Sequence, residues 1–142
     1  MKCALELQII ATVREEEIRK EKEEAERKKA LAIRTGTIAK CESIGSILEE
    51  MANNGKQPCY DFCIDKYNRP LIATNNQYAD RRLSYHCSTN PTPIDFNLMK
   101  EWFAEYCFEI SAEEFSYYHY GFGVCEGHKI SIKPSAECLK NI

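Results

Sequence analysis

Eight cysteines and three histidines are the residues of this 142-residue chain whose chemistry is most distinctive. Zinc prefers thiolate and imidazole ligands in a tetrahedral array, and a zinc knuckle often uses two ligands across a tight turn. Cys125 and His128 have that spacing, and His86 and Cys87 could supply two more ligands. The simpler interpretation is that the thiols pack as small hydrophobic groups. The sequence therefore predicts no cofactor, with zinc as the alternative.

Catalytic motifs are missing from the sequence. A thiol enzyme needs a cysteine beside a histidine, and eight thiols with three histidines allow such pairs by chance. The chain contains no Gly-rich phosphate loop, no Gly-x-Ser-x-Gly and no His-Glu-x-x-His. We therefore expect that the protein is not an enzyme, and a thiol-dependent enzyme is the alternative.

Aromatic residues crowd the segment 115–124, which we expect to form a hairpin with 129–133. A three-residue loop within Cys125–His128 would set Val124 against Ile130 and make one consistent apolar face. The opposite face would carry a bare backbone strip that a protein partner could contact. The predicted partner-binding surface consists of Tyr117, His119, Gly121, Gly123 and Lys129.

Charge argues against nonspecific binding to nucleic acid. The net charge is −3, and no basic patch accompanies the aromatic residues that could stack on bases. Tyrosine and tryptophan are also enriched in protein interfaces. A protein partner is therefore favoured, and a nucleic-acid-binding regulator, with or without zinc, is the alternative.

The cysteine pattern and the hydropathy bear on the compartment. An even number of cysteines suggests disulfides, but the first residues do not resemble a signal peptide and no glycosylation site is present. No apolar stretch approaches the roughly 20 residues of a membrane span. We therefore expect a cytoplasmic protein with free thiols and no membrane contact.

The segment Ala4–Arg34 must position whatever surface the chain uses. Glu, Lys, Arg and Ala fill its middle, and these are strong helix formers. Glutamates stand four residues before basic residues, in the pairs Glu15–Arg19, Glu16–Lys20, Glu23–Arg27 and Glu24–Lys28. Each such pair stabilises a helix by roughly 0.2–0.5 kcal/mol. A helix of this length is about 46 Å long at 1.5 Å per residue, so we expect part of it to project or to find a partner.

One apolar position of this helix repeats every seven residues. We call it the heptad column, and its members are Ala4, Ala11, Ile18, Ala25, Ala32 and Ala39. A heptad repeat is typical of a coiled coil, although the companion position is apolar only at Leu7. Two interpretations are open, a solvated helix that packs at its ends and a parallel or antiparallel pairing. The predicted interface consists of Leu7, Ile10, Ala11, Ile18, Ala25 and Ala32.

The remaining pattern predicts an α+β fold. Gly36 suggests a helix break, and the following residues to Met51 carry apolar side chains at helical spacing. Three strands are expected between residues 59 and 87, then an amphipathic helix that begins after Asp95 and reaches Ile110, then two more strands. The expected architecture is a helical arm, 1–55, with a break near Gly36, and an antiparallel β-β-β-α-β-β domain, 57–142.

These patterns predict a protein-binding module without catalytic activity. It would assemble through its N-terminal helix as a homo-oligomer, and we expect a dimer, because a heptad column can pair with a copy of itself. It would act by binding, or inhibiting, a macromolecular partner. This combination is typical of small accessory proteins that viruses and mobile elements encode to block a host machine.

Overall fold

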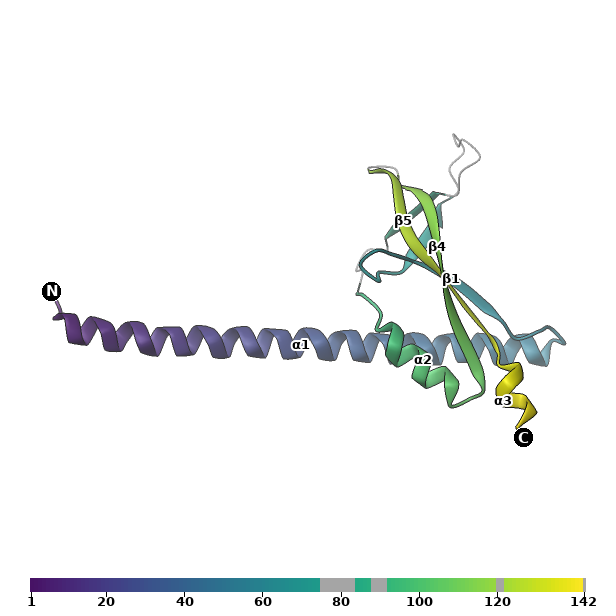
Figure 1. The fold of residues 1–142 in the computed structure, drawn as a ribbon, viewed down its shortest axis with the longest axis horizontal. Helices are drawn as coiled ribbons and strands as arrows, with labels where there is room; N and C mark the ends of the chain where they lie inside the picture. Colours follow the sequence, from purple (N-terminus) through teal and green to yellow (C-terminus); the bar gives the residue numbers. More distant parts are fainter. Residues whose placement is uncertain (75–83, 88–91, 120–121, 142) are drawn as a thin grey trace. The chain divides into compact units, whose positions relative to one another are not determined.

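The computed structural model describes residues 1–74, 84–87, 92–119 and 122–141, and it has the expected α+β class (Figure 1). A long helix is followed by three strands, a short helix, two long strands and a final short helix. The helices are α1 (Ala4–Asn53), α2 (Phe96–Ala104) and α3 (Ala136–Lys140). The strands are β1 (Tyr60–Asp65), β2 (Leu71–Thr74), β3 (Ser84–Cys87), β4 (Phe108–His119) and β5 (Gly123–Pro134).

The chain divides into two compact units, Met1–Ala32 and Ile33–Ile142. The division lies inside α1 and not near residues 55–57, where the helical arm was expected to end. The last turns of α1 belong to the second unit because they supply part of its core. In that core, Cys41, Ile44 and Leu48 pack with residues of the sheet and of α2.

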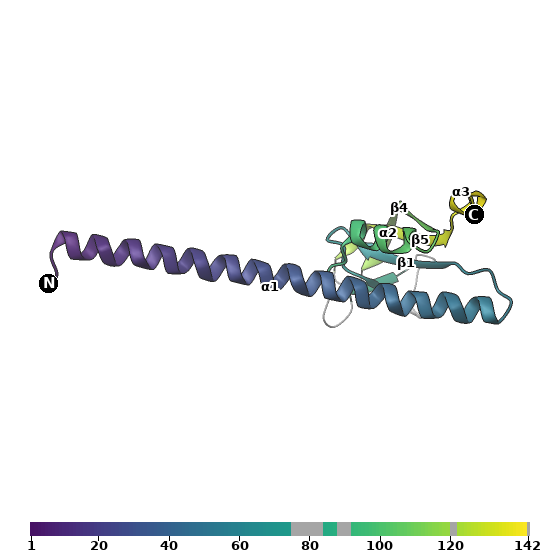
Figure 2. The same cartoon turned by 90° about the horizontal axis from the view of Figure 1, so that it is seen from below.

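The predicted helix break at Gly36 is wrong, since α1 continues without interruption from Ala4 to Asn53 (Figure 2). A glycine inside a helix costs about 1 kcal/mol relative to alanine. Burial of the turn that follows Gly36 offsets this cost. In that turn the buried Thr37 hydroxyl donates a hydrogen bond to the Ile33 carbonyl at 2.7 Å. The same hydroxyl accepts a hydrogen bond from the Asp95 backbone N–H at 2.9 Å, which ties α1 to the start of α2.

The five strands form one sheet in the order β1-β5-β4-β3-β2. Neighbouring strands are antiparallel except β3 and β4, whose pairing is parallel. An isolated bridge between Ile64 and Pro70 joins β1 to the start of β2, so the two ends of the strand order meet. The sheet is therefore partly closed on itself, with a second, enclosed face behind the core.

The predicted register of the last hairpin is wrong. Val124 pairs with Tyr118 and not with Ile130, which instead pairs with Ala112. The amphipathic helix was expected to reach Ile110, but α2 ends at Ala104 and β4 begins at Phe108. Because β4 continues to His119 and β5 begins at Gly123, Cys125–His128 lie within β5.

The hydrophobic core lies between one face of the sheet and two helices. Its buried members are Cys41, Ile44, Leu48, Ile64, Ile94, Met99, Phe103, Ile110, Ile130 and Ile132. The cross-strand pair Ile110–Ile132 lies on this face. In α2, Met99 and Phe103 pack against this face of the sheet, and both side chains are almost completely buried. The core therefore fixes the last turns of α1, α2 and the sheet as one unit.

A buried carboxylate organises the turn between β1 and β2. Asp65 is 3% exposed and accepts hydrogen bonds from the backbone N–H groups of Tyr67 and Arg69 and from the Arg69 guanidinium, the last at 2.7 Å. Burial raises the pKa of Asp65, but the hydrogen bonds and the charge of Arg69 outweigh it and leave the pKa lowered. The carboxylate therefore stays ionised and holds the turn.

Two glycines test the continuity of α1. Gly36 lies in the helix, and a Cβ there would only make ordinary contact with Thr92 at 3.8 Å, whereas Gly55 has φ +74 after the helix. We expect Gly36→Ala to raise the free energy of unfolding by about 0.5–1 kcal/mol. We expect Gly55→Ala to lower it by about 1–2 kcal/mol. Urea titration measures both, and destabilisation by Gly36→Ala would show that α1 is broken there.

Candidate functional site

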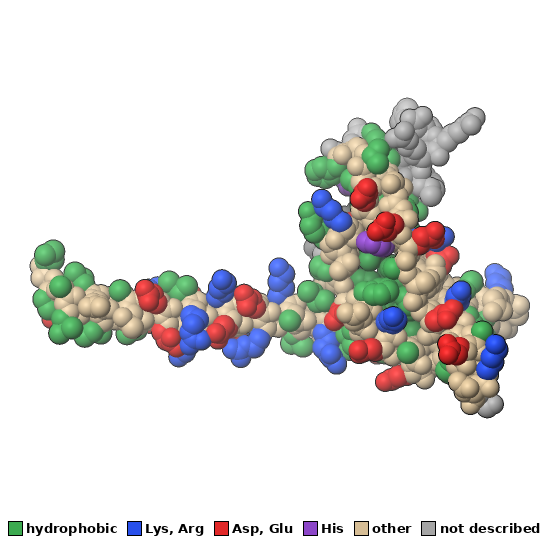
Figure 3. All heavy atoms as spheres, in the orientation of Figure 1, with side chains coloured by type: hydrophobic (Ala, Val, Ile, Leu, Met, Phe, Trp, Pro, Cys, Tyr) green, Lys and Arg blue, Asp and Glu red, His purple; other side chains and the backbone are tan. Residues whose placement is uncertain are grey.

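The unit Met1–Ala32 leaves large apolar side chains in water. Leu7, Ile10 and Ile18 are 47%, 46% and 49% exposed, and the three alanines of the predicted interface, Ala11, Ala25 and Ala32, are exposed as well. Other exposed apolar residues of this unit are Leu5, Ile9, Val13 and Leu31. Figure 3 shows hydrophobic side chains at the N-terminal end of α1 and charged side chains over its middle. All six predicted interface residues are therefore accessible in this unit.

Within Met1–Ala32 the heptad column forms a continuous stripe, because one helix carries its members from Ala4 to Ala32. Residues seven apart are displaced by only about 20° around a helix axis. The stripe consists mostly of alanine, with Ile18 as its largest side chain. Small side chains allow a second helix to approach closely, whereas leucine-rich seams hold helices further apart.

Ion pairs within the helix neutralise many charges beside this stripe. Arg19 pairs with Glu16 and Glu23, and Lys28 pairs with Glu24 at 3.6 Å. Of the four expected pairs, Glu24–Lys28 is confirmed. The guanidinium of Arg19 is large enough to reach carboxylates three residues before it and four residues after it. Hydrogen bonding to Arg19 lowers the pKa of Glu16, so this pair is charged.

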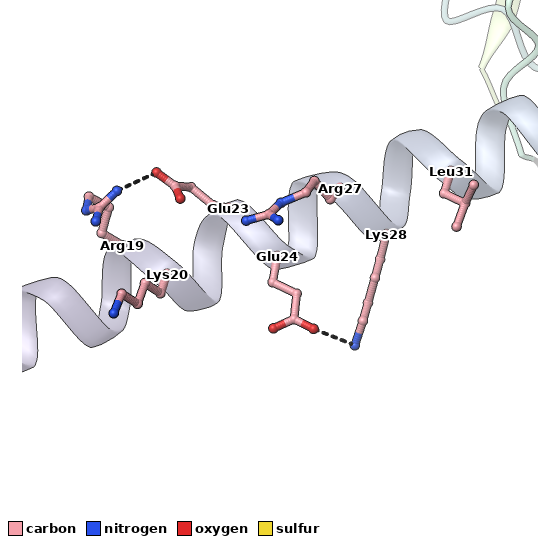
Figure 4. A pocket seen from close by; sticks show the side chains of 7 residues that line it. All are labelled: Arg19, Lys20, Glu23, Glu24, Arg27, Lys28 and Leu31. Atoms are coloured by element: carbon pink, nitrogen blue, oxygen red, sulfur yellow. Dashed lines mark hydrogen bonds and ion pairs between the residues drawn. The ribbon is translucent and has the colours of Figure 1, made fainter.

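A hollow of about 580 Å³ lies along the middle of this unit (Figure 4). Its lining residues are Arg19, Lys20, Glu23, Glu24, Arg27, Lys28 and Leu31, all from the same helix. Arg27 follows Ile18 by nine residues, which places it about 180° around the axis. The hollow is therefore the charged, solvated side of the helix, opposite the heptad column.

The predicted partner-binding surface is not gathered on one exposed face. Tyr117 is only 6% exposed, because the Tyr85 and Phe115 rings pack against it with centroids 5.9 and 5.4 Å away. His119 is half-buried with its ring 4.9 Å from that of Phe122. Gly123 is also half-buried, has φ +74 and begins β5. Lys129 is exposed, and its Nζ lies 3.9 Å from Oδ2 of Asp61. Gly121 lies outside the described residues.

A close approach of the backbone occurs at Gly127, which was not predicted. A Cβ there would lie 2.3 Å from the Ile64 carbonyl oxygen and 3.1 Å from Cε1 of Tyr117. Glycine is therefore required where β1 pairs with β5 and the Phe115 and Tyr117 rings of β4 lie over the strand. The wrong hairpin register hid this role, because it placed Gly127 in a loop.

The four candidate metal ligands do not form the predicted knuckle. Cys125 pairs with Tyr117 and His128 pairs with Glu114, so both lie within β5. Residues three apart in a strand point to opposite faces. His86 and Cys87 belong to β3, which β4 separates from β5 in the sheet. Among the residues that the structure describes, no group of three or more His, Cys, Asp or Glu side chains is arranged to hold a metal ion.

The expectation that all thiols are free is wrong, because Cys107 and Cys138 form a disulfide. Phe108 pairs with Pro134, and the Ser135 N–H donates to the Cys107 carbonyl at 2.8 Å. The register of β4 and β5 therefore brings the turn before β4 beside α3. Sequence spacing alone could not reveal this pair without the correct start of β4.

The free cysteines differ in their exposure. Cys3 and Cys59 are exposed, Cys63 and Cys125 are half-buried, and Cys41 is buried in the core. Burial, with the nearby Glu42 charge, raises the pKa of Cys41 to about 11. This thiol therefore stays protonated and packs as a small hydrophobic group, which is unsuited to nucleophilic chemistry.

An apolar groove of about 360 Å³ lies between the last turns of α1 and α2. Its lining residues are Glu42, Gly45, Ser46, Leu48, Glu49, Ala52, Pro58, Trp102, Phe103, Tyr106 and Phe108. The Trp102 ring lies against α1 at Gly45, where a Cβ would make an ordinary contact with it at 3.5 Å. The helical pattern placed Trp102 and Tyr106 on the core face, but Tyr106 is 60% exposed. Such a groove can receive apolar side chains.

No protein-family model, curated protein or solved structure gives a significant match to this chain. Among the described residues, no helix combines the length and the apolar character that crossing a membrane requires.

The disulfide gives a direct test of the β4–β5 register. Digestion without reductant should yield one peptide pair joined through Cys107 and Cys138. Reduction should lower the free energy of unfolding by about 3–4 kcal/mol, because the bond closes a loop of 31 residues. Cys3→Ser, which replaces an exposed free thiol, should leave that energy unchanged. Recovery of both cysteines as separately alkylated thiols would contradict the structure.

Proposed function

We propose that this chain is a protein-binding module that assembles through Met1–Ala32. The supporting observation is the exposure of Leu7, Ile10 and Ile18 on a helix whose polar side is already paired within itself. Full burial of one such side chain stabilises by roughly 1.5–3 kcal/mol. Since these side chains are about half exposed, covering each one would contribute about 1 kcal/mol. A partner helix covers them most simply.

The composition of this surface fits a protein better than a nucleic acid. The heptad column contains no basic residue, and the carboxylates Glu16 and Glu23 engage Arg19. A nucleic-acid site needs cations that are available for phosphates. Alanine and isoleucine at heptad spacing are typical of helix pairing. The second unit would then present its own surfaces, including the groove beside Trp102, to further protein ligands.

Two alanine-to-lysine variants test assembly through the heptad column. Ala25 belongs to the column, whereas Ala30 lies five residues later, about 140° around the axis, and both are exposed in this unit. Both changes add one positive charge and replace the same residue type in the same helix. We expect Ala25→Lys to weaken self-association at least about tenfold, because a cation would be buried at the contact.

Sedimentation velocity across micromolar concentrations measures this effect. The matched control, Ala30→Lys, should associate like the unchanged protein to within about threefold, a difference below 1 kcal/mol. A monomer at every concentration for the unchanged chain, or equal weakening by both variants, would rule out assembly through this column.

A further inference from the structure

We infer that the apolar groove between the last turns of α1 and α2 binds a basic amphipathic helix of a partner protein. This helix carries two lysines or arginines seven positions apart, with two large apolar side chains between them on the same face. All residues that line the groove belong to the unit Ile33–Ile142, so the site is complete within one compact unit. The inference rests on the proposed protein-binding function, and it adds the chemistry of the partner.

Core packing holds the groove in its shape. Two of its lining residues, Leu48 and Phe103, belong to the hydrophobic core and are only 4% and 1% exposed. The Trp102 ring packs edge-on against that of Phe103, with the two centroids 4.8 Å apart. A site that exists before binding loses little conformational freedom when a ligand enters it, which favours affinity.

Aromatic side chains of the groove remain accessible to a ligand. Tyr106 is 60% exposed with its ring 4.9 Å from that of Trp102, and Trp102 and Phe108 are half-buried. Tryptophan and tyrosine are enriched among the residues that dominate binding energy in protein interfaces. An apolar cavity of about 150 Å³ is enough for one benzene-sized group. At about 360 Å³, the groove has room for two leucine-sized side chains.

The charged residues that line the groove are both acidic. Glu42 and Glu49 are exposed, and the ion pairs among the described residues include neither of them. The segments that form the two helical walls, 41–53 and 96–106, together hold five acidic residues and one basic residue, a net charge of −4. Charge complementarity therefore selects a basic partner and opposes an acidic one.

The spacing of the two carboxylates favours a helical partner. Residues seven apart share a face of a helix, so Glu42 and Glu49 stand about 10.5 Å apart along α1. A partner helix beside α1 matches this distance with basic residues seven positions apart. Its side chains three and four positions after the first basic residue then lie between the charges and enter the groove. An extended segment spans the same distance in about three residues, and its two intermediate side chains point to opposite faces.

A synthetic peptide tests this inference on the full-length protein. The peptide is helix-forming and free of tryptophan, with two lysines seven positions apart and leucines three and four positions after the first. Trp102 lines the groove and is the only tryptophan of the chain, so its fluorescence reports occupation directly. We expect a saturable change of its emission at micromolar peptide. Glutamates in place of the two lysines, or alanines in place of the two leucines, should weaken binding at least about tenfold.

Two alanine-to-phenylalanine variants test whether the groove is the binding site. Ala52 lines the groove, whereas Ala104 lies two residues after Trp102 in α2, about 160° from it around the axis, and both alanines are exposed. Ala52→Phe should weaken peptide binding at least about tenfold, because the added ring occupies the groove. The matched control, Ala104→Phe, should bind the peptide to within about twofold of the unchanged protein.

A second pair of variants tests the role of charge. Glu49 lines the groove, and its neighbour Glu50 is exposed about 100° further around the helix and does not line it. Glu49→Gln should weaken binding of the lysine peptide about two- to fivefold, the size expected for an exposed ion pair. Glu50→Gln removes the same charge from the adjacent position and should change the affinity less than about 1.5-fold at physiological salt, where such charges are screened.

The outcomes separate this inference from the proposed assembly. No response of Trp102 up to millimolar peptide, or equal affinity for the lysine and glutamate peptides, would overturn the inference. Equal effects of Ala52→Phe and Ala104→Phe would overturn it as well, because binding would then lie outside the groove. Equal binding of a peptide whose leucines are flanked by prolines would show that the occupant is not helical. Sedimentation of the same protein tests the assembly separately, since Ala25→Lys lies outside the unit that carries the groove.

Discussion

The structure depends on the burial of one face of α1 against the sheet and α2. Thr37, Cys41, Ile44 and Leu48 lie on that face, and the Thr37 hydroxyl links the helix to Asp95. This packing stabilises the helix past Gly36, where local propensity alone favours a break. Ala39 lies about 160° around the helix axis from Cys41, so it stays exposed on the opposite side of this part of the helix. One contact thus determines both the core and the exposed side of the last turns of α1.

Local patterns in the sequence predicted most of the elements. The charged helix, the order of strands and helix in the second half, and the α+β class are confirmed, because each depends on propensity and hydrophobic periodicity. The break at Gly36 and the end of α2 were wrong because tertiary contacts decide them. An error of a few residues at the start of β4 then changed the register of the whole hairpin. Such errors have large effects in a sheet, because a shift of the register by one residue moves every side chain of the strand to the other face.

The candidate sites also differ in whether local patterns or tertiary contacts determine them. The exposed apolar residues of α1, such as Leu7 and Ile18, could be selected from spacing because a helix fixes which side chains share a face, and their role in an interface stays a prediction. The sheet residues could not, because Tyr117 is covered by Tyr85 from a strand distant in sequence. The disulfide of Cys107 and Cys138 and the close contact at Gly127 also depend on strand pairing. Local sequence patterns thus predicted which side chains share a face of α1. The surroundings of the sheet residues depend on strand pairing between distant segments.

We propose that the exposed heptad column becomes covered when copies of the chain associate. Amide hydrogen exchange at two protein concentrations measures this directly, because pairing protects a helix that otherwise frays. We expect amides of residues 14–29 to exchange more slowly at the higher concentration, while those of the core segment 41–48 do not change. Equal exchange of residues 14–29 at concentrations from low to high micromolar would contradict it.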